Sequence, residues 1–247
     1  MDPRLLVISK RLEGVKAVVP VMSPKGGVGK TLIASSLALA FVERGRKVGL
    51  LDLDVTNASS HIVLGVKLDE LKPLEEKGVV PPLVNGVKFM TICYYSSGNP
   101  LPLRGKDVDE AIKEMLATVI WNQLDLLLID TPPGISDEVL DIVSYVSEPR
   151  PLIVTTPSRL SIASIEKLLK MLTESRVKAI GVVENMVITE EGTTKDLAGK
   201  YGVEVIGRIP YDPFIERSIG DVRILKSTSF FSKVMSLADK VLVKLGL

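Results

Sequence analysis

The sequence predicts a single α/β domain with a doubly wound, mostly parallel sheet and helices on both faces. Short apolar, β-branched runs alternate along the chain with stretches of helical periodicity, which is typical of successive βαβ units. The 247 residues fit one large domain of this class, and the 46% that are hydrophobic supply a packed core. We therefore expect one domain over residues 1–247.

These periods predict the individual elements in order. The expected strands are Ala17–Met22, Val48–Asp52, Val87–Ile92, Leu126–Asp130, Leu152–Thr155, Ala179–Met186 and Val205–Ile209. The expected helices are Lys30–Arg44, Val108–Val119, Glu138–Val146, Ile162–Glu174, Thr194–Tyr201 and Phe230–Leu245. Asp107 and Glu110 predict a capping box for the second helix, and Pro20 predicts an irregularity in the first strand because it lacks an amide hydrogen. The proline-containing stretch 66–105 predicts loops and a hairpin over one sheet edge.

The composition limits the classes of partner and compartment. The 31 lysines and arginines nearly balance the 30 aspartates and glutamates, so no overall field attracts nucleic acid or an anionic membrane. One cysteine excludes an intramolecular disulfide framework and favours a reducing compartment. The apolar run near the start is too short for a signal peptide, and no apolar stretch is long enough to span a bilayer. We expect a cytoplasmic protein that binds neither nucleic acid nor a membrane.

A glycine-rich run follows the first expected strand and precedes a helix. It reads Ser23-Pro24-Lys25-Gly26-Gly27-Val28-Gly29-Lys30-Thr31. Glycines let successive backbone N–H groups point at phosphate oxygens, and the helix N-terminus adds the positive end of its dipole. In such a loop Lys30 reaches the β- and γ-phosphates and the Thr31 hydroxyl binds Mg²⁺. We expect ATP and Mg²⁺ as ligands, with the nucleotide held by Gly26, Gly27, Val28, Gly29, Lys30 and Thr31.

Carboxylates follow two further strands on the same expected edge. Asp52 ends the second expected strand and Asp54 follows it, and strand alternation places both on one face if the strand continues that far. Asp130 ends an apolar strand in the Walker B arrangement, which delivers a carboxylate to the metal. We therefore expect Thr31 and Asp130 around Mg²⁺. Asp52 and Asp54 can serve Mg²⁺ and the attacking water, although either could instead cap the following turn. Gly134 leaves the loop after Asp130 free to respond to the γ-phosphate.

Lys25 is the additional lysine of the deviant Walker A motif, and with it the sequence resembles the MinD/ParA superfamily, in particular its Mrp/ApbC branch of iron–sulfur carriers. The matching segments are Gly14–Lys16, Asp52–Asp54 with Ser59, Leu103–Gly105, Trp121–Asp125, Asp130–Glu138, Val154–Pro157, Gly181–Met186 and Gly207–Pro213. The resemblance implies that Lys25 reaches the partner's ATP across a homodimer. The same resemblance implies that Asp54 orients the lytic water while Asp52 supports the metal shell, so that Asp52 joins Thr31 and Asp130 as a metal residue. It also implies that Asn185 reads the adenine while the loop at Pro210 and Asp212 closes over the same base.

One part of the branch pattern is missing. Carriers of this branch hold a cluster through a C-x-x-C pair after the segment that reads Glu184-Asn185-Met186 here, and this chain has no cysteine there. A four-iron, four-sulfur cluster normally takes four thiolates. The sole cysteine, Cys93, follows the strand Val87–Ile92 and is expected to be a small buried residue. We expect no self-contained cluster site, and a protein partner such as a cysteine-bearing cluster carrier.

The leading interpretation is a slow Mg²⁺-dependent ATPase whose nucleotide state switches a homodimer, with Lys25, Lys30 and Asp54 as catalytic residues and a role linked to iron–sulfur cluster assembly. Two alternatives stay open: a MinD/ParA-like positioning switch acting on a membrane, DNA or protein partner, and a nucleotide-binding regulator with little turnover. MinD-like proteins end in a membrane-binding helix. We expect the amphipathic stretch Phe230–Leu245 to pack on the sheet instead, and His61 to be a packing or surface residue.

Overall fold

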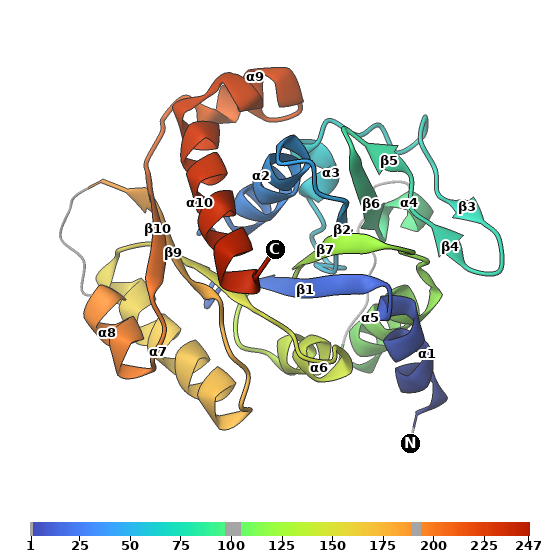
Figure 1. Ribbon diagram of the computed structural model, residues 1–247, viewed down its shortest axis with the longest axis horizontal. Helices are drawn as coiled ribbons and strands as arrows, with labels where there is room; N and C mark the ends of the chain where they lie inside the picture. The colour runs from blue at the N-terminus through green and yellow to red at the C-terminus, as the bar shows by residue number, and fades with distance from the viewer. Residues whose placement is uncertain (1, 97–104, 189–193) are drawn as a thin grey trace.

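The computed structural model describes residues 2–96, 105–188 and 194–247, and its centre is an eight-stranded sheet (Figure 1). From one edge to the other the strands are β10 (Val205–Pro210), β9 (Gly181–Val187), β8 (Leu152–Thr155), β1 (Val15–Met22), β7 (Leu124–Asp130), β2 (Val48–Asp52), β6 (Val87–Thr91) and β5 (Leu83–Val84). All neighbours pair in parallel except β5, which is antiparallel to β6. The central strands are buried on both faces, which explains their unbroken apolar runs.

Helices cover both faces of this sheet, as the sequence predicts (Figure 1). One face carries α2 (Lys30–Glu43), α3 (Ser60–Val63), α9 (Val222–Ser227) and α10 (Ser229–Leu245). The other carries α1 (Pro3–Leu12), α5 (Lys106–Thr118), α6 (Asp137–Tyr145), α7 (Arg159–Glu174) and α8 (Thr194–Lys200). A short helix, α4 (Cys93–Ser96), follows β6, and a 3-10 helix, η1 (Ile215–Ser218), follows β10. The doubly wound fold is confirmed.

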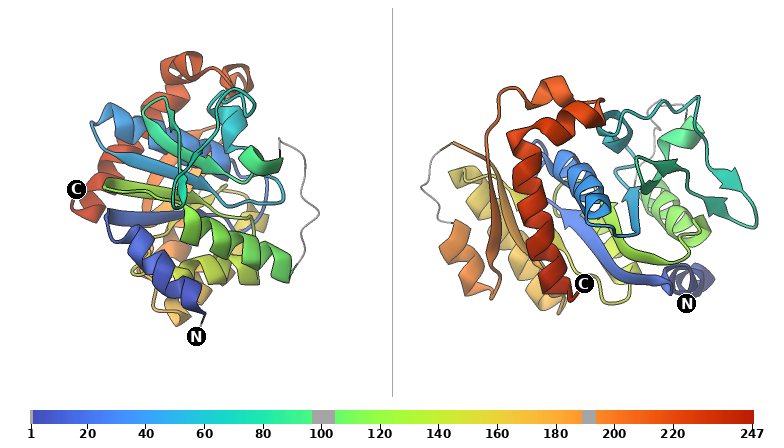
Figure 2. Two further views of the ribbon diagram at one scale, coloured as in Figure 1. Left: turned by 90° about the vertical axis from the view of Figure 1, so that its right-hand side faces the viewer. Right: turned by 45° about the horizontal axis from the view of Figure 1, so that its top comes forward.

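The C-terminal helix α10 packs against the domain. It lies along α2 and β10 (Figure 2) and buries Phe230, Phe231, Val234, Leu237, Ala238, Val241 and Leu242. Its apolar face is therefore occupied by the protein's own core, as the sequence predicts. Within the described ranges, no helix is both long and apolar enough to cross a membrane.

Every expected strand and helix is present with small shifts of its ends. The structure also contains the helix α1, which the sequence analysis did not predict. Its first turn is capped by the Asp2 side chain, which accepts from the Arg4 N–H, and Pro3 occupies the first helical position. Asp followed by Pro is a recognised helix start, so the signal was present. Burial of Ile8 and Leu12 holds α1 in place beside α5.

The expected hairpin is also confirmed, as β3 (Leu74–Glu75) paired with β4 (Val79–Val80), whereas residues 97–104 of that stretch lie outside the described ranges.

Two local expectations are wrong. The helix α5 begins at Lys106 with Gly105 at its N-cap position, so Asp107 and Glu110 lie inside the helix and form no capping box. Glu110 instead accepts a 2.6 Å hydrogen bond from Arg4.

The register of β1 against β7 continues through Pro20 without a shift, and its pairing with β8 begins only at the next residue. The missing amide hydrogen therefore falls before that ladder starts, and no irregularity follows.

Candidate functional site

The glycine-rich loop joins the end of β1 to α2 and leaves open space beside its glycines. Gly27 and Gly29 have φ angles of +76° and +80°, which glycine adopts without strain. A Cβ atom added at Gly26 or Gly27 would meet no atom within 4 Å. Among the hydrogen bonds of the described residues, none is donated by the backbone N–H of Gly26, Gly27 or Gly29. Unused donors around open space fit an anion such as a phosphate group.

Two side chains of the loop converge on one carboxylate at the end of β7. Lys30 Nζ donates to Asp130 Oδ1 over 2.5 Å, and Thr31 Oγ1 donates to Asp130 Oδ2 over 2.6 Å. The exposed fraction is 6% for the Lys30 side chain and 0% for that of Asp130. The structure therefore brings together the predicted phosphate-binding lysine, the predicted metal-binding hydroxyl and the Walker B carboxylate. A buried ion pair of this kind is sustained because both partners are hydrogen-bonded.

Asp52 lies beside Asp130, in register on the neighbouring strand β2. Its Oδ1 accepts from the Asp54 N–H at 3.2 Å, and its Oδ2 accepts from the N–H groups of Ser59 and Ser60 at 3.1 and 2.9 Å. Burial, with the nearby Asp130 charge, raises the pKa of Asp52 from 3.8 to about 7. Asp52 thus holds the loop that leads into α3, which is the turn-capping role allowed from the sequence. Its predicted place around Mg²⁺ stays a prediction.

Asp54 is buried two residues further on. Its Oδ1 accepts from Thr56 Oγ1 and from the Asn57 N–H, each at 3.2 Å. Burial raises the pKa of Asp54, while the nearby positive charge of Lys30 lowers it. The carboxylate therefore lies within electrostatic reach of Lys30 and also begins a turn. His61 lies in α3 just beyond, where burial lowers its pKa and its Nδ1 has no partner in the described part of the chain.

The loop that follows β7 is tied to the start of the glycine-rich loop. Gly134 N–H donates to the Ser23 carbonyl at 2.9 Å, and Thr131 Oγ1 donates to the Val21 carbonyl at 3.0 Å. The Ser23 hydroxyl is buried and has no hydrogen-bond partner among the described residues. These bonds, which the sequence does not reveal, connect the two loops on either side of Asp130. A change in one loop can therefore reach the other.

The residues expected at the nucleobase lie at the ends of β9 and β10. Asn185 is buried, and its Nδ2 donates to the Val28 carbonyl of the glycine-rich loop at 2.9 Å. Pro210 pairs with Val187, and the Tyr211 N–H donates to the Val187 carbonyl. Asp212 Oδ1 accepts from the Phe214 N–H at 2.9 Å, so Asp212 shapes its own turn. The structure thus places the three predicted residues Asn185, Pro210 and Asp212 at one corner of the same edge.

Lys25 and Cys93 differ in their surroundings. Lys25 is half-buried and forms no ion pair or hydrogen bond with any residue that the structure describes. Cys93 is buried at the start of α4, 3.9 Å from the Ala58 carbonyl, and burial raises the pKa of its thiol. A buried thiol with a raised pKa is unreactive, so the expected small buried residue is confirmed. The segment 189–192, where the cysteine pair of the resembled branch falls, lies outside the described ranges.

The described side chains at this site are too few to hold a metal ion without further ligands. The described residues contain no group of three or more histidine, cysteine, aspartate or glutamate side chains arranged to hold a metal ion by themselves. The Thr31 hydroxyl and the Asp130 carboxylate, 2.6 Å apart beside the open glycine surface, are the donors that Mg²⁺ uses together with phosphate oxygens. The residues present therefore fit a Mg²⁺ ion that arrives with a nucleotide.

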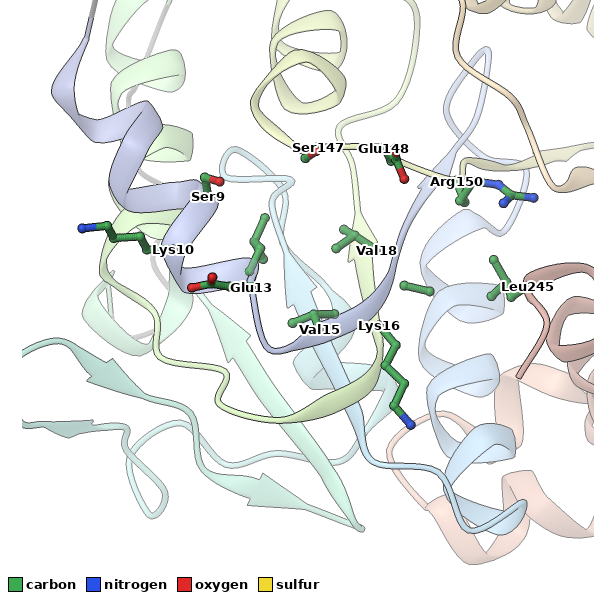
Figure 3. Close-up of a pocket in the computed structure, with 12 residues that line it drawn as sticks. Ser9, Lys10, Glu13, Val15, Lys16, Val18, Ser147, Glu148, Arg150 and Leu245 are labelled. Atoms are coloured by element: carbon green, nitrogen blue, oxygen red, sulfur yellow. The ribbon is translucent and has the colours of Figure 1, made fainter.

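A separate hollow of about 520 Å³ lies at the opposite, amino-terminal end of β1 (Figure 3). It is lined by charges of both signs, including Lys10, Glu13, Lys16 and Glu148. Lys16 is already paired with Asp125 at 2.7 Å. Ligands of parallel α/β sheets bind at the carboxyl ends of the strands, so this hollow is not a candidate for the nucleotide.

Comparison with known proteins agrees with this geometry. Residues 14–242 match the family model described as ParA, the NUBPL iron-transfer P-loop NTPases. The chain belongs to this family of P-loop NTPases. It is 32% identical to a cytosolic Fe–S cluster assembly factor NUBP2 homolog of Monosiga brevicollis, over 97% of this chain and 92% of that protein. It is 34% identical to an iron–sulfur cluster carrier protein of Saccharolobus solfataricus, over 96% and 86% of the two chains.

The fold of this P-loop NTPase also matches a solved structure. The nucleotide-binding protein of Archaeoglobus fulgidus, solved in complex with ADP, superposes with a TM-score of 0.77 at 30% identity. The match covers 93% of this chain and 96% of the other.

The raised pKa of Asp52 predicts a pH-dependent stability. The folded protein keeps the Asp52 proton to higher pH than the unfolded chain does, so the free energy of unfolding should fall as pH rises from about 4 to about 7. The neutral amide of the variant Asp52→Asn does not titrate in this range. The stability of the wild type relative to Asp52→Asn, measured by urea denaturation across this range, should therefore decrease with pH.

Asp125→Asn provides a control of opposite sign. Hydrogen bonds from the Lys16 side chain and the Lys47 N–H lower the pKa of Asp125. The stability that wild-type Asp125 contributes should be present above about pH 4 and be lost as pH falls further. A stability difference between the wild type and Asp52→Asn that stays constant from about pH 4 to about pH 7 would contradict the assignment of a raised pKa.

Proposed function

We propose that this P-loop NTPase is a Mg²⁺-dependent ATPase whose nucleotide state switches a homodimer. The observation that carries the proposal is the open glycine surface with unused N–H donors, next to a lysine and a hydroxyl that share one buried carboxylate. Triphosphate oxygens fit those donors, and Lys30 is within reach of both the carboxylate and the loop. Mg²⁺, held by Thr31 with Asp130 behind it, would supply charge neutralisation at the phosphates.

The remaining side chains take roles that follow from where they lie. Asp54 orients the attacking water, since its carboxylate is near Lys30 and only part of its acceptor capacity is used by Thr56 and Asn57. The hydrogen bonds of Asp54 with Thr56 and Asn57 favour slow ATP hydrolysis, because the carboxylate must break them before it can orient the attacking water. Asn185, Pro210 and Asp212 hold the adenine, because they share one corner beside Val28 of the phosphate loop. Asp52 supports the metal indirectly through its position beside Asp130.

The dimer is proposed from the surroundings of Lys25. A half-buried lysine with no counter-ion in the described part of its own chain is suited to a phosphate that a second subunit presents. The amphipathic helix α10 favours this switch over a membrane-bound positioning protein, because its apolar face is packed on α2 and β10. The near balance of charge gives no support to DNA as the partner.

The biological role is proposed from the relatives. Their names place two of them in iron–sulfur cluster assembly or carriage, and one is named cytosolic. We propose a cytoplasmic function in cluster assembly in which this chain holds no cluster and acts with a cysteine-bearing carrier. The ATP-binding side chains are all present, whereas the sequence holds one cysteine, and that cysteine is buried.

Loss of Lys30 should abolish nucleotide binding. Charge-assisted hydrogen bonds contribute about 1.5–3 kcal/mol each, so losing those to two phosphates predicts a Kd for Mg·ATP that rises roughly 100-fold or more in Lys30→Ala. Isothermal titration calorimetry measures this, with circular dichroism to confirm folding. Lys67→Ala, which removes an exposed lysine that pairs with Glu70, is the control and should bind as the wild type does. Wild-type affinity in Lys30→Ala would refute the assignment.

Lys25 should act across an ATP-dependent dimer. With Mg·ATP, light scattering of Asp54→Ala should give a mass near twice 26.8 kDa, because blocked hydrolysis preserves the nucleotide that joins the subunits. Lys25→Ala should bind ATP yet lose turnover, measured as phosphate release. Wild-type protein that hydrolyses ATP while remaining monomeric at every protein concentration would exclude the dimer.

The chain should hold no iron–sulfur cluster of its own. Protein purified without oxygen and supplied with iron and sulfide should contain no stable four-iron, four-sulfur cluster after desalting, because two subunits offer only two thiolates and both are buried. Iron, acid-labile sulfide and the visible spectrum measure this. A near-stoichiometric cluster that survives Cys93→Ser would contradict the proposed role. A cluster lost in that variant would make Cys93 a ligand.

A further inference from the structure

A buried carboxylate lies one residue before Asn185. The side chain of Glu184 on β9 is 3% exposed, and its Oε2 accepts a 2.6 Å hydrogen bond from Nε of Arg208 on the edge strand β10. The two residues are direct cross-strand partners. Arg208 itself is 41% exposed. A carboxylate in this position needs its cation, because a buried charge without a partner is strongly unfavourable.

The ion pair lies at an unusual point of the ladder between β9 and β10. The register of β10 shifts twice, between Val205 and Gly207 and again between Arg208 and Pro210. The pair of Glu184 and Arg208 falls between the two shifts. Backbone hydrogen bonds alone therefore leave the register of this edge strand weakly specified, and the ion pair supplies a fixed point within it.

The ion pair of Glu184 with Arg208 is close in sequence to Asn185 on β9 and to Pro210 on β10, the two strands that flank the proposed base site. Successive side chains of a strand point to opposite faces, so Asn185 turns away from Glu184 and donates to the Val28 carbonyl of the phosphate loop. Two residues after Arg208, Pro210 ends β10 and begins the segment that leads to Asp212. A slip of β10 along β9 would therefore move Pro210 and Asp212 relative to Asn185.

We infer that Glu184 and Arg208 form a positioning pair that sets the nucleobase end of the site and so contributes to recognition of the base. The inference rests on the proposed function, since it assumes that Asn185 and the segment from Pro210 to Asp212 hold the adenine. Neither Glu184 nor Arg208 has to touch the nucleotide. Their effect is to hold the two strand ends at one separation, while the phosphate loop is held independently by Lys30, Thr31 and Asp130.

This separation of roles gives a selective test. Glu184→Gln keeps the shape of the side chain and removes its charge. The variant should bind Mg·ATP roughly tenfold more weakly than the wild type, and should bind Mg·tripolyphosphate, which has no base, within about twofold of the wild type. Isothermal titration calorimetry with both ligands measures this, and the thermal midpoint of each protein is recorded alongside. Asp239→Asn, which breaks the 2.6 Å pair of Asp239 with Arg44 elsewhere in the fold, should change neither affinity.

A second variant approaches the pair from its exposed side. Arg208→Gln should give the same selective loss. The loss in the double variant should be smaller than the sum of the two single losses, because each single variant already removes the pair of Glu184 with Arg208. If Glu184→Gln does not fold, Arg208→Gln carries the test alone. Equal weakening of ATP and tripolyphosphate, or ATP binding unchanged in both variants, overturns the inference. Wild-type protein that binds neither ligand would instead refute the proposed function, so the two failures are distinguishable.

Discussion

The carboxylate of Asp130 is fully buried at the end of β7, and the rest of the site is arranged around it. Burial of this charge is tolerable only because Lys30 Nζ and Thr31 Oγ1 both donate to it. That requirement fixes the first turn of α2 against the end of the central strand, and so fixes the curve of the loop before it. The strand order, with β7 between β1 and β2, then brings the glycine-rich loop to one side of Asp130 and Asp52 to the other. One buried charge thus organises three segments that are distant in sequence.

Asp52 and Asp54 belong to one short acidic motif but differ in their hydrogen bonds. Asp52 uses both oxygens on backbone N–H groups, including those of Ser59 and Ser60, and its raised pKa reflects burial beside Asp130. Asp54 keeps more of its acceptor capacity and lies nearer the end of the motif. The spacing in sequence is compatible with a metal role for either residue. Only the hydrogen bonds distinguish them: those of Asp52 hold the loop that follows β2, whereas Asp54 keeps acceptor capacity for chemistry.

The fold was largely predictable because its signals are local. The buried parallel strands and the phosphate loop with its flanking strand and helix are each contained in short stretches. Predictions whose outcome depends on contacts with distant parts of the chain failed more often. The capping box at Asp107 failed because α5 starts earlier, and Glu110 is used by Arg4 of α1, a contact across the fold. The irregularity at Pro20 failed because its neighbour strand begins one residue later, which no sequence pattern near Pro20 reveals. The helix α1 was missed although Asp2 and Pro3 signal its start.

The segment from Glu184 to Asn185 explains why, in the proposed site, the nucleobase end depends more on distant contacts than the phosphate end does. Alternation along β9 sends one side chain toward Arg208 at the sheet edge and the next toward Val28 in the phosphate loop. The same strand therefore contacts both the edge strand and the glycine-rich loop. At the phosphate end, Lys30 and Thr31 of α2 contact Asp130 at the end of β7, a central strand with a neighbour on each side. At the base end, β10 has a neighbour on one side only and a register that shifts twice, and there the ion pair of Glu184 with Arg208 adds a side-chain contact to the ladder.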